Sequence, residues 1–302
     1  MVNLTLAEGQ GKDKLDLDFE RAYDLPMTQT AKPWTEFDLI AFDTETSGAW
    51  PVGCDVVEFG AVKWSEGREV DHLQFLLKPR EPMSAFIIGI HGITNEMVAE
   101  APPIADVVHT IHEFFKDSVL MAHHAPFDLG FMALEFEKAK LPFPRGELLC
   151  TSLLARKLIS GVENHKLQTL AKALKIDGGA AHRALDDART CMQVGLHCLN
   201  LLGPDATLQE AVEVQGKTLR WTDFVIPQTG VMATIAEAIG KKQDVEFIYD
   251  RGTAVRQAKP LGVVRNPDGD FMQAICRNDR TSKRFYVAKI RDVGLTPPVN
   301  LD

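Results

Sequence analysis

The sequence predicts an α/β domain built on a mixed sheet and, after it, a small all-β domain. Three strand patterns come first, over residues 39–43, 56–62 and 73–77, and they predict an opening β-meander. Strands and helices then alternate, which favours a sheet covered by helices. From residue 245 onward the strands are short and separated by turn residues, as at 250–252. At 302 residues the chain has room for two domains.

The pattern divides the chain into four segments. Residues 1–35 are polar, acidic and weakly periodic, which predicts a loosely ordered arm pinned by Trp34. Residues 36–203 are expected to form the α/β domain, 204–230 a linker and 231–302 the all-β domain. Periodicity predicts a strand at 119–122, helices near 104–116, 127–140, 147–159, 166–174, 184–202 and 231–241, and late strands at 245–249, 260–264, 271–276 and 284–287.

Composition is ordinary for a soluble globular protein, with 45% hydrophobic and 25% charged residues. No apolar stretch reaches about 18 residues and the N-terminus lacks the pattern of a secretory signal, so neither a membrane span nor secretion is expected. The five cysteines form no CxxC pair, which predicts reduced thiols in the cytoplasm.

Two carboxylates follow the first strand at a spacing that points them to one side. Residues 39–42 form a buried-strand pattern, and Asp43 and Glu45 follow it two residues apart. Side chains alternate along a strand, so both carboxylates project from the same face. Two like charges beside apolar sequence repel unless a proton or a divalent cation compensates them. Alone, the pair also fits an acidic turn after an edge strand.

A further acidic position follows the short apolar run at 119–122. Asp128 comes two residues after Pro126, at the start of a helical pattern. Asp is a favoured N-cap, because its side chain accepts a backbone hydrogen bond and suits the positive end of the helix dipole. Asp128 is therefore either a helix cap or a metal ligand.

The last helix of the α/β domain carries an acidic residue on its apolar stripe. Asp187 shares that face with Val194 and Cys198, whereas Asp186 lies on a solvent-type face. A carboxylate that faces a core is costly unless it is paired or bound to a metal, so Asp187 is the candidate and Asp186 the bystander. His182 reaches the same site only from a loop ahead of the helix, which two glycines just upstream allow.

Together Asp43, Glu45, Asp128 and Asp187 supply hard oxygen ligands of the kind that Mg²⁺ or Mn²⁺ prefers. His182 adds a group that exchanges a proton near neutral pH. Such a set is equipped for two-metal hydrolysis of a phosphodiester, in which one ion lowers the pKa of a bound water and both stabilise the reacting oxygens.

Three segments resemble the exonuclease motifs of the DEDDh (DnaQ-like) 3′–5′ exonuclease family. They are residues 43–48, 123–128 and 182–188, and their order and spacing agree with the family over about half of the chain. Arg183 stands where the related DEDDy branch has Tyr, and His124 stands where relatives usually carry Asn. The resemblance implies an RNase H-like fold and hydrolysis at the 3′ ends of single-stranded DNA or RNA, including short oligonucleotides.

The resemblance also implies a role for each residue of the acidic set. Asp43, Glu45 and Asp187 would hold two Mg²⁺ or Mn²⁺ ions, and Asp128 would bind directly or through water. His182 would be the general base for the attacking water.

Two further residues carry over as contacts to the substrate. Residues 90–94 resemble a family element that lines the terminal-nucleotide pocket, which implies binding by His91, and Thr46 follows from the first motif. A structural histidine in a strand-to-helix turn is the alternative for His91.

The late strands resemble a WYL domain, an SH3-like barrel, although residues 271–273 are Phe-Met-Gln where the name-giving Trp-Tyr-Leu would stand. Residues 241–302 hold 12 Lys and Arg against 8 Asp and Glu, a net +4, whereas the remainder carries −13. A basic domain suits a nucleic acid or a nucleotide-like ligand, but any small barrel also needs a charged outer face for solubility. The cations expected on a phosphate-binding face are Arg256, Arg265, Arg277, Arg280, Lys283 and Arg284.

The sequence thus predicts a metal-dependent 3′–5′ exonuclease that acts on single-stranded nucleic acid. The alternative is a regulatory binding protein, in which the C-terminal domain senses a nucleotide and the exonuclease fold is a non-catalytic platform. The complete set of carboxylates together with His182 argues against that alternative, because a degraded site would be expected to have lost a ligand.

Overall fold

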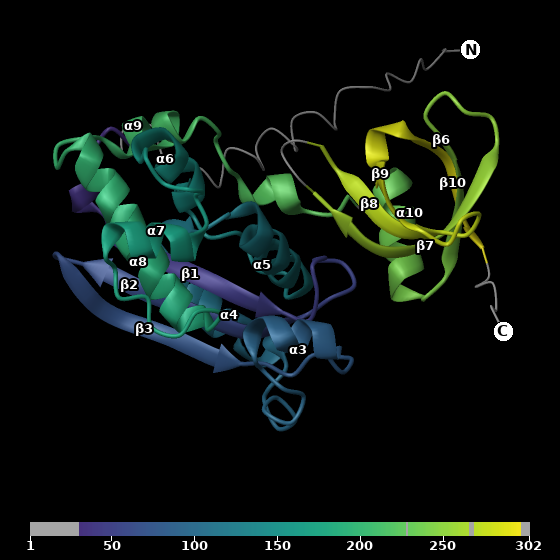
Figure 1. The fold of residues 1–302 in the computed structure, drawn as a ribbon, viewed down its shortest axis with the longest axis horizontal. Helices are drawn as coiled ribbons and strands as arrows, with labels where there is room; N and C mark the ends of the chain where they lie inside the picture. Colours follow the sequence, from purple (N-terminus) through teal and green to yellow (C-terminus); the bar gives the residue numbers. More distant parts are fainter. Residues whose placement is uncertain (1–29, 228, 266–268, 297–302) are drawn as a thin grey trace, which may run out of the picture.

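The computed structural model describes residues 30–227, 229–265 and 269–296. Most of the arm predicted over residues 1–35 lies outside the described residues. The described part contains two five-stranded sheets, each with its own helices (Figure 1).

The first sheet is mixed, as the sequence predicts. Its order is β3-β2-β1-β4-β5, with β1, β2 and β3 antiparallel and β4 and β5 added parallel to β1. β1 is central and almost wholly buried, which matches its apolar run. The strands are β1 (Leu39–Thr46), β2 (Val56–Ser65), β3 (Arg68–Leu76), β4 (Val119–Ala122) and β5 (Leu148–Cys150).

Two helical layers cover this sheet, and alternate residues of β1 face opposite layers. Ile40 and Phe42 pack into the cluster that contains α4 (Ile104–Phe115) and α5 (Pro126–Lys138). Leu39 and Ala41 pack into the other cluster. That second layer consists of α6 (Thr151–Leu158), α7 (Leu167–Leu174), α8 (Ala184–Leu202) and α9 (Leu208–Gln215).

Two local elements of this domain differ from the sequence prediction. The helix expected over 147–159 begins only at Thr151, because residues 148–150 pair in parallel with β4 as strand β5. A three-residue apolar run does not by itself distinguish strand from helix, and the neighbouring strand decides. The short helix α3 (Ala85–His91) was not predicted; Ser84 caps its first turn and Gly92 ends it in the left-handed conformation.

The segment expected to be a linker, residues 204–230, is instead largely packed against the first domain. It contains α9 and the 3-10 turn η2 (Trp221–Phe224). Trp221 and Phe224 are buried in the core beside α4 and α5. Trp34, in the 3-10 turn η1 (Trp34–Glu36), is also buried, and its indole N–H donates to the Gly203 carbonyl at 2.9 Å.

The C-terminal sheet is antiparallel in the order β10-β6-β7-β8-β9, with α10 (Gly230–Gly240) packed on it. The turn η3 (Val287–Lys289) carries the chain from one edge of the sheet to the other, so the sheet is strongly curved. Among the described residues no ladder joins β9 to β10, so the SH3-like barrel expected from the sequence is not confirmed. The strands are β6 (Asp244–Tyr249), β7 (Val255–Val264), β8 (Phe271–Cys276), β9 (Ser282–Tyr286) and β10 (Ile290–Thr296), the last of which was not predicted.

Within the described ranges, the helices are all too short or too polar to cross a membrane.

Candidate active site

The candidate site lies at the carboxyl end of β1, where the two helical layers meet. Asp43 and Glu45 continue the odd-numbered face of β1 that packs against α8. Asp187 is buried in the first turn of α8, as its place on the apolar stripe predicts. Side-chain ligand atoms of Glu45, His182 and Asp187 lie within 4.8 Å of one another.

His182 is held beside Asp187 through its backbone. The His182 N–H donates to Asp187 Oδ2 at 2.8 Å, and Gln168 Nε2 donates to Oδ1 at 2.8 Å. His182 adopts a left-handed backbone with φ +61°, and its side chain is exposed. The imidazole therefore faces solvent at the site, while the main chain of its loop orients the Asp187 carboxylate.

Asp128 reaches the site from the opposite helical layer. Its Oδ1 accepts hydrogen bonds from the Thr44 hydroxyl at 2.8 Å and from the Thr44 N–H at 3.0 Å. Asp128 is the third residue of α5 and is buried, while Ala125 occupies the N-cap position without a side-chain cap. The helix-cap interpretation of Asp128 is therefore wrong. Thr44, which the sequence analysis missed, fixes the orientation of the carboxylate.

His124, the departure from the second motif, also has a left-handed backbone, with φ +63°. Asn and His both populate this region more readily than most residues. The replacement of the usual Asn therefore keeps the turn into α5 and leaves Asp128 in place.

The carboxylates at this site are electrostatically crowded. Burial raises the pKa of Asp43 well above its usual range, and the Asp128 carboxylate raises it further. Burial raises the pKa of Glu45 to about 8, with Asp187 adding to the rise. Burial also raises the pKa of Asp128 to about 7, despite the opposing hydrogen bonds from Thr44. The site thus favours bound protons or a bound cation over free negative charge.

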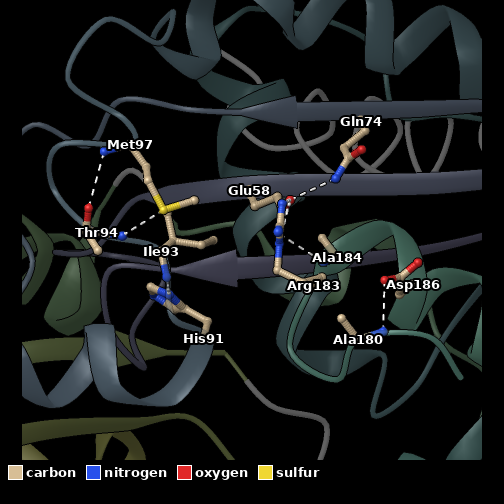
Figure 2. A network of polar contacts seen from close by, with 10 residues as sticks. All are labelled: Glu58, Gln74, His91, Ile93, Thr94, Met97, Ala180, Arg183, Ala184 and Asp186. Atoms are coloured by element: carbon tan, nitrogen blue, oxygen red, sulfur yellow. Dashed lines mark hydrogen bonds and ion pairs between the residues drawn. The ribbon is translucent and has the colours of Figure 1, made fainter.

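Asp186, predicted to lie on a solvent-type face, is half-buried and binds the loop that precedes α8. Its Oδ2 accepts the Ala180 N–H at 3.0 Å, as Figure 2 shows. A Cβ at Gly179 would lie 2.7 Å from Asp186 Cγ, and Gly179 has φ +60°, a left-handed conformation that favours glycine. Asp186 therefore fastens the loop that carries His182.

Glu58 is a functional candidate that sequence reasoning missed. It is fully buried in β2 and directly faces Glu45 in the β1–β2 ladder. Arg183 binds both of its oxygens, with Nη2 at 2.8 Å from Oε1, and the Ala184 N–H and Gln74 Nε2 donate to it at 3.0 Å (Figure 2). Burial alone would raise the pKa of Glu58, but these hydrogen bonds offset that effect and hold the pKa below its ordinary value. An acidic residue inside an apolar strand run was the available signal.

This ion pair fixes the start of α8. Arg183 follows His182 and occupies the N-cap position, and a Cβ at Gly60 would lie 2.2 Å from the Leu185 nitrogen. Strand β2 and the first turn of α8 are therefore in direct contact, and Glu58 ties them together. His182 and Asp187 lie on either side of that anchor.

Glu58→Gln is expected to destabilise the fold by about 2–4 kcal/mol. Removing one partner of a fully buried ion pair would destabilise the fold by more than this. The Arg183 side chain, however, is 36% exposed, so solvent partly screens its charge. The matched control is Glu69→Gln, because the Glu69–Arg189 pair has the same geometry at 2.8 Å but is 33% and 39% exposed. Urea denaturation should show a loss of at most about 1 kcal/mol for this control. Equal losses of stability in the two variants would mean that burial does not make the Glu58–Arg183 pair more stabilising than the Glu69–Arg189 pair.

The comparison with known families agrees with this geometry. Residues 40–194, about half of the chain, match the RNase T exonuclease family model. The chain belongs to the RNase T exonuclease family. It is 38% identical over 148 residues to the PolC-type DNA polymerase III of Bacillus cereus, and the match covers 49% of this chain and 10% of that protein. The chain thus spans about a tenth of the length of such PolC-type relatives.

Two solved exonuclease structures are similar to this chain. Exonuclease I superposes with a TM-score of 0.51 at 16% identity, covering 79% of this chain and 55% of that one. Exonuclease X, solved with 5′ overhanging duplex DNA, is 31% identical with a TM-score of 0.47, covering 59% of this chain and 99% of that one. The match to exonuclease I supports the fold assignment.

In this family member, Thr46 and His91 lie beside each other near the end of β1. Burial lowers the pKa of His91, and the nearby Thr46 backbone opposes that effect. The Thr46 hydroxyl donates to the Gly48 carbonyl at 2.7 Å, and His91 Nδ1 accepts the Ile93 N–H at 3.0 Å. His91 ends helix α3 and does not lie in a strand-to-helix turn. His91 is buried and lies close enough to Glu58 and His182 for their charges to influence its pKa.

Helix α3 also presents an apolar face that the sequence analysis missed. Phe86 is 77% exposed and Ile90, one turn later, is 45% exposed. His91 follows Ile90 directly, so this face borders the pair formed with Thr46. Exposed aromatic and aliphatic side chains beside a candidate site are contact candidates for nucleobases.

Three of the six basic residues expected on the phosphate-binding face bind other groups of the protein. Arg277 binds the buried Asp244 through two hydrogen bonds of 2.6 and 2.7 Å. Arg265 donates to the Val225 carbonyl at 2.6 Å, and Lys283 pairs with Asp279. These three side chains thus already have partners within the protein, although the Lys283–Asp279 pair is exposed to solvent. The remaining members of the set are Arg256, Arg280 and Arg284, the last of which stacks 4.0 Å above the Phe271 ring.

Proposed function

We propose that this protein is a metal-dependent DEDDh 3′–5′ exonuclease that hydrolyses phosphodiester bonds at the 3′ ends of single-stranded DNA or RNA. The observation that carries the proposal is the grouping of Glu45, His182 and Asp187, with Asp43 and Asp128 beside them. Membership of the exonuclease family supports it. Because none of the five cysteines is paired, we place the activity in the cytoplasm.

The donor set fits two Mg²⁺ or Mn²⁺ ions. Asp43, Glu45, Asp128 and Asp187 offer only oxygen, and burial is the largest cause that raises the pKa of each, so a bound cation would favour their ionised forms. When bound, the ions would supply positive charge for the reacting phosphate and a water of lowered pKa. The crowding that disfavours free carboxylates is what a divalent cation would relieve.

The chain's own residues supply the proton transfer and the positioning. His182, exposed at the edge of the acidic set, would take the proton of the attacking water at an imidazole nitrogen. Asp186 and Arg183 hold its loop from either side. Thr46 and His91 would border the terminal nucleotide, and the α3 face would contact its base.

The C-terminal domain would add contacts to a longer strand or to a nucleotide-like ligand. The basic balance of residues 241–302 supports this role, as does the WYL-like sequence pattern. With Arg265, Arg277 and Lys283 engaged internally, the phosphate contacts would come from Arg256, Arg280 and Arg284. The contribution of this domain to phosphate binding is therefore expected to be smaller than its net charge indicates.

The test of the proposed function is hydrolysis of labelled single-stranded DNA, RNA and a dinucleotide with Mg²⁺ or Mn²⁺. We expect mononucleotides released from the 3′ end, because the site is built for one terminal phosphodiester, and no release in excess EDTA. A 5′ label and a 3′ label on the same strand establish the direction. Hydrolysis that survives chelation would rule out the metal assignment. Nucleotide binding without hydrolysis would favour the regulatory alternative.

Metal binding should depend on pH, because cations and protons compete for the same oxygens. With a pKa of about 8, Glu45 is largely protonated at about pH 6 and ionised at about pH 9 in the metal-free protein. Its pKa is raised on folding, so the metal-free protein should lose stability as pH rises from the ordinary glutamate range toward about 8. Thermal unfolding with and without Mg²⁺ should show the larger metal stabilisation at the higher pH. An equal shift at both values would contradict this.

A further inference from the structure

The loop between β1 and β2, residues 47–55, links the candidate site to the C-terminal sheet. It follows Thr46 directly, and β1 points toward the C-terminal sheet (Figure 1). The neck of the loop is closed, because the Ser47 N–H donates to the Asp55 carbonyl and the Asp55 N–H donates to Ser47 Oγ, both at 2.8 Å. These two hydrogen bonds make the loop a compact unit that continues directly from Thr46, so a shift of the whole loop would act on the end of β1.

Trp50, at the tip of this loop, is seated on a glycine of the C-terminal sheet. A Cβ at Gly262 would lie 2.2 Å from both Cβ and Cγ of Trp50, which no other residue permits. Gly262 has no positive φ, so contact and not backbone conformation requires glycine here. The register of β7 against β8 shifts between Pro260 and Gly262, and the Phe271 ring meets Trp50 edge-on at 6.0 Å.

Other contacts extend this junction on both sides of Trp50. Val52 packs against the core of the C-terminal sheet, and a Cβ at Gly53 would lie 3.0 Å from the Leu261 carbonyl oxygen. An open cleft of about 840 Å³ flanks the loop, lined by Ser47 and Asp55 among others. The cleft borders both the tip and the neck of the loop, which leaves room for the loop to shift as a unit. Losing the contact of Trp50 would allow that shift.

We propose that the C-terminal domain positions the nuclease site through Trp50. On this proposal Trp50 is a positioning residue, which holds Thr46 and Glu45 by fixing the loop that follows them, and the proposal rests on the function proposed above. Because the junction is apolar, its effect should appear on the shortest substrates and should not depend on salt. A domain that acted only as an electrostatic grip would show the opposite behaviour.

The test is a double-mutant cycle in the full chain, with Trp50→Ala, Gly262→Ala and both together. Hydrolysis of a dinucleotide with Mg²⁺ reports the site alone. We expect each single variant to lower kcat/KM by about 10- to 100-fold, the scale of a misplaced reacting group. The double variant should be about as slow as Gly262→Ala and not slower, because both changes break the same contact and alanine at position 50 keeps the Cβ that meets the added methyl group. Trp50→Phe, which keeps an aromatic ring against Phe271, should retain most of the activity.

Gly294→Ala is the matched control, since it lies in β10 of the same sheet and a Cβ there would meet Glu246 at an ordinary 3.9 Å. Its rate should equal that of the unmodified protein. Hydrogen exchange provides a readout independent of activity: residues 44–48 should exchange faster in Gly262→Ala, while β6 and β8 stay protected.

Two results would overturn the proposal. One is dinucleotide hydrolysis by Gly262→Ala at the unmodified rate, with losses confined to long strands at low salt. The other is unchanged exchange at residues 44–48. If the unmodified protein hydrolysed no substrate, the proposed function would fail, and the exchange experiment would still decide whether Trp50 holds the end of β1.

Discussion

Asp187→Asn is expected to lower kcat by at least about 10³-fold, the scale seen when a catalytic group is removed. Both Asp187 oxygens accept hydrogen bonds, from the His182 N–H and from Gln168 Nε2, each at 2.8 Å. The asparagine side chain would place its NH₂ group against one of these two N–H donors. It would also lack the negative charge that binds a cation. The change therefore damages both the metal site and the orientation of the His182 loop.

Asp186→Asn is the matched control on the same turn of α8. The amide keeps one oxygen that can accept the Ala180 N–H, so we expect most of the rate to remain. Single-turnover hydrolysis at several Mg²⁺ concentrations gives the comparison, and thermal unfolding confirms that both variants fold. Similar losses in the two variants would show that Asp187 has no special role at the site.

Three of the proposed metal ligands were predictable because local periodicity places them. The two-residue alternation of β1 puts Asp43 and Glu45 on one face, and the helical repeat puts Asp187 on the buried stripe of α8. Each inference needs only the neighbouring residues and the geometry of one element. The mixed sheet followed in the same way from the order of strand and helix patterns.

The features that were not predicted have a different cause. Each depends on a residue or strand that lies far away in the sequence. Glu58 looks like an interruption of an apolar strand until Arg183, 125 residues later, is placed beside it. Thr44 and Asp128 are 84 residues apart and meet only because two layers converge. Likewise, strand β5 exists because β4 offers an edge to pair with, and no local pattern reveals whether β9 and β10 close a barrel.

Replacing His182 is expected to lower kcat by about 10²- to 10⁴-fold, the usual contribution of a positioned general base. The loss should fall on the rate and not on the Mg²⁺ concentration that gives half-maximal activity. Asp187 is oriented by the backbone N–H of His182, and that group survives any side-chain change except proline. The imidazole can therefore be removed without removing the hydrogen bond that positions the carboxylate.

The backbone at this position decides which variant gives a clean result. With φ at +61°, alanine would be strained by about 1–2 kcal/mol and would loosen the loop, whereas asparagine tolerates this conformation and lacks a base of suitable pKa. His182→Asn should thus lose as much kcat as His182→Ala while keeping the thermal stability that alanine lowers. His197→Ala, at an exposed histidine on α8, should change neither property. A near-normal kcat in His182→Asn would assign the base elsewhere, and a large rise in the required Mg²⁺ would make His182 a metal ligand.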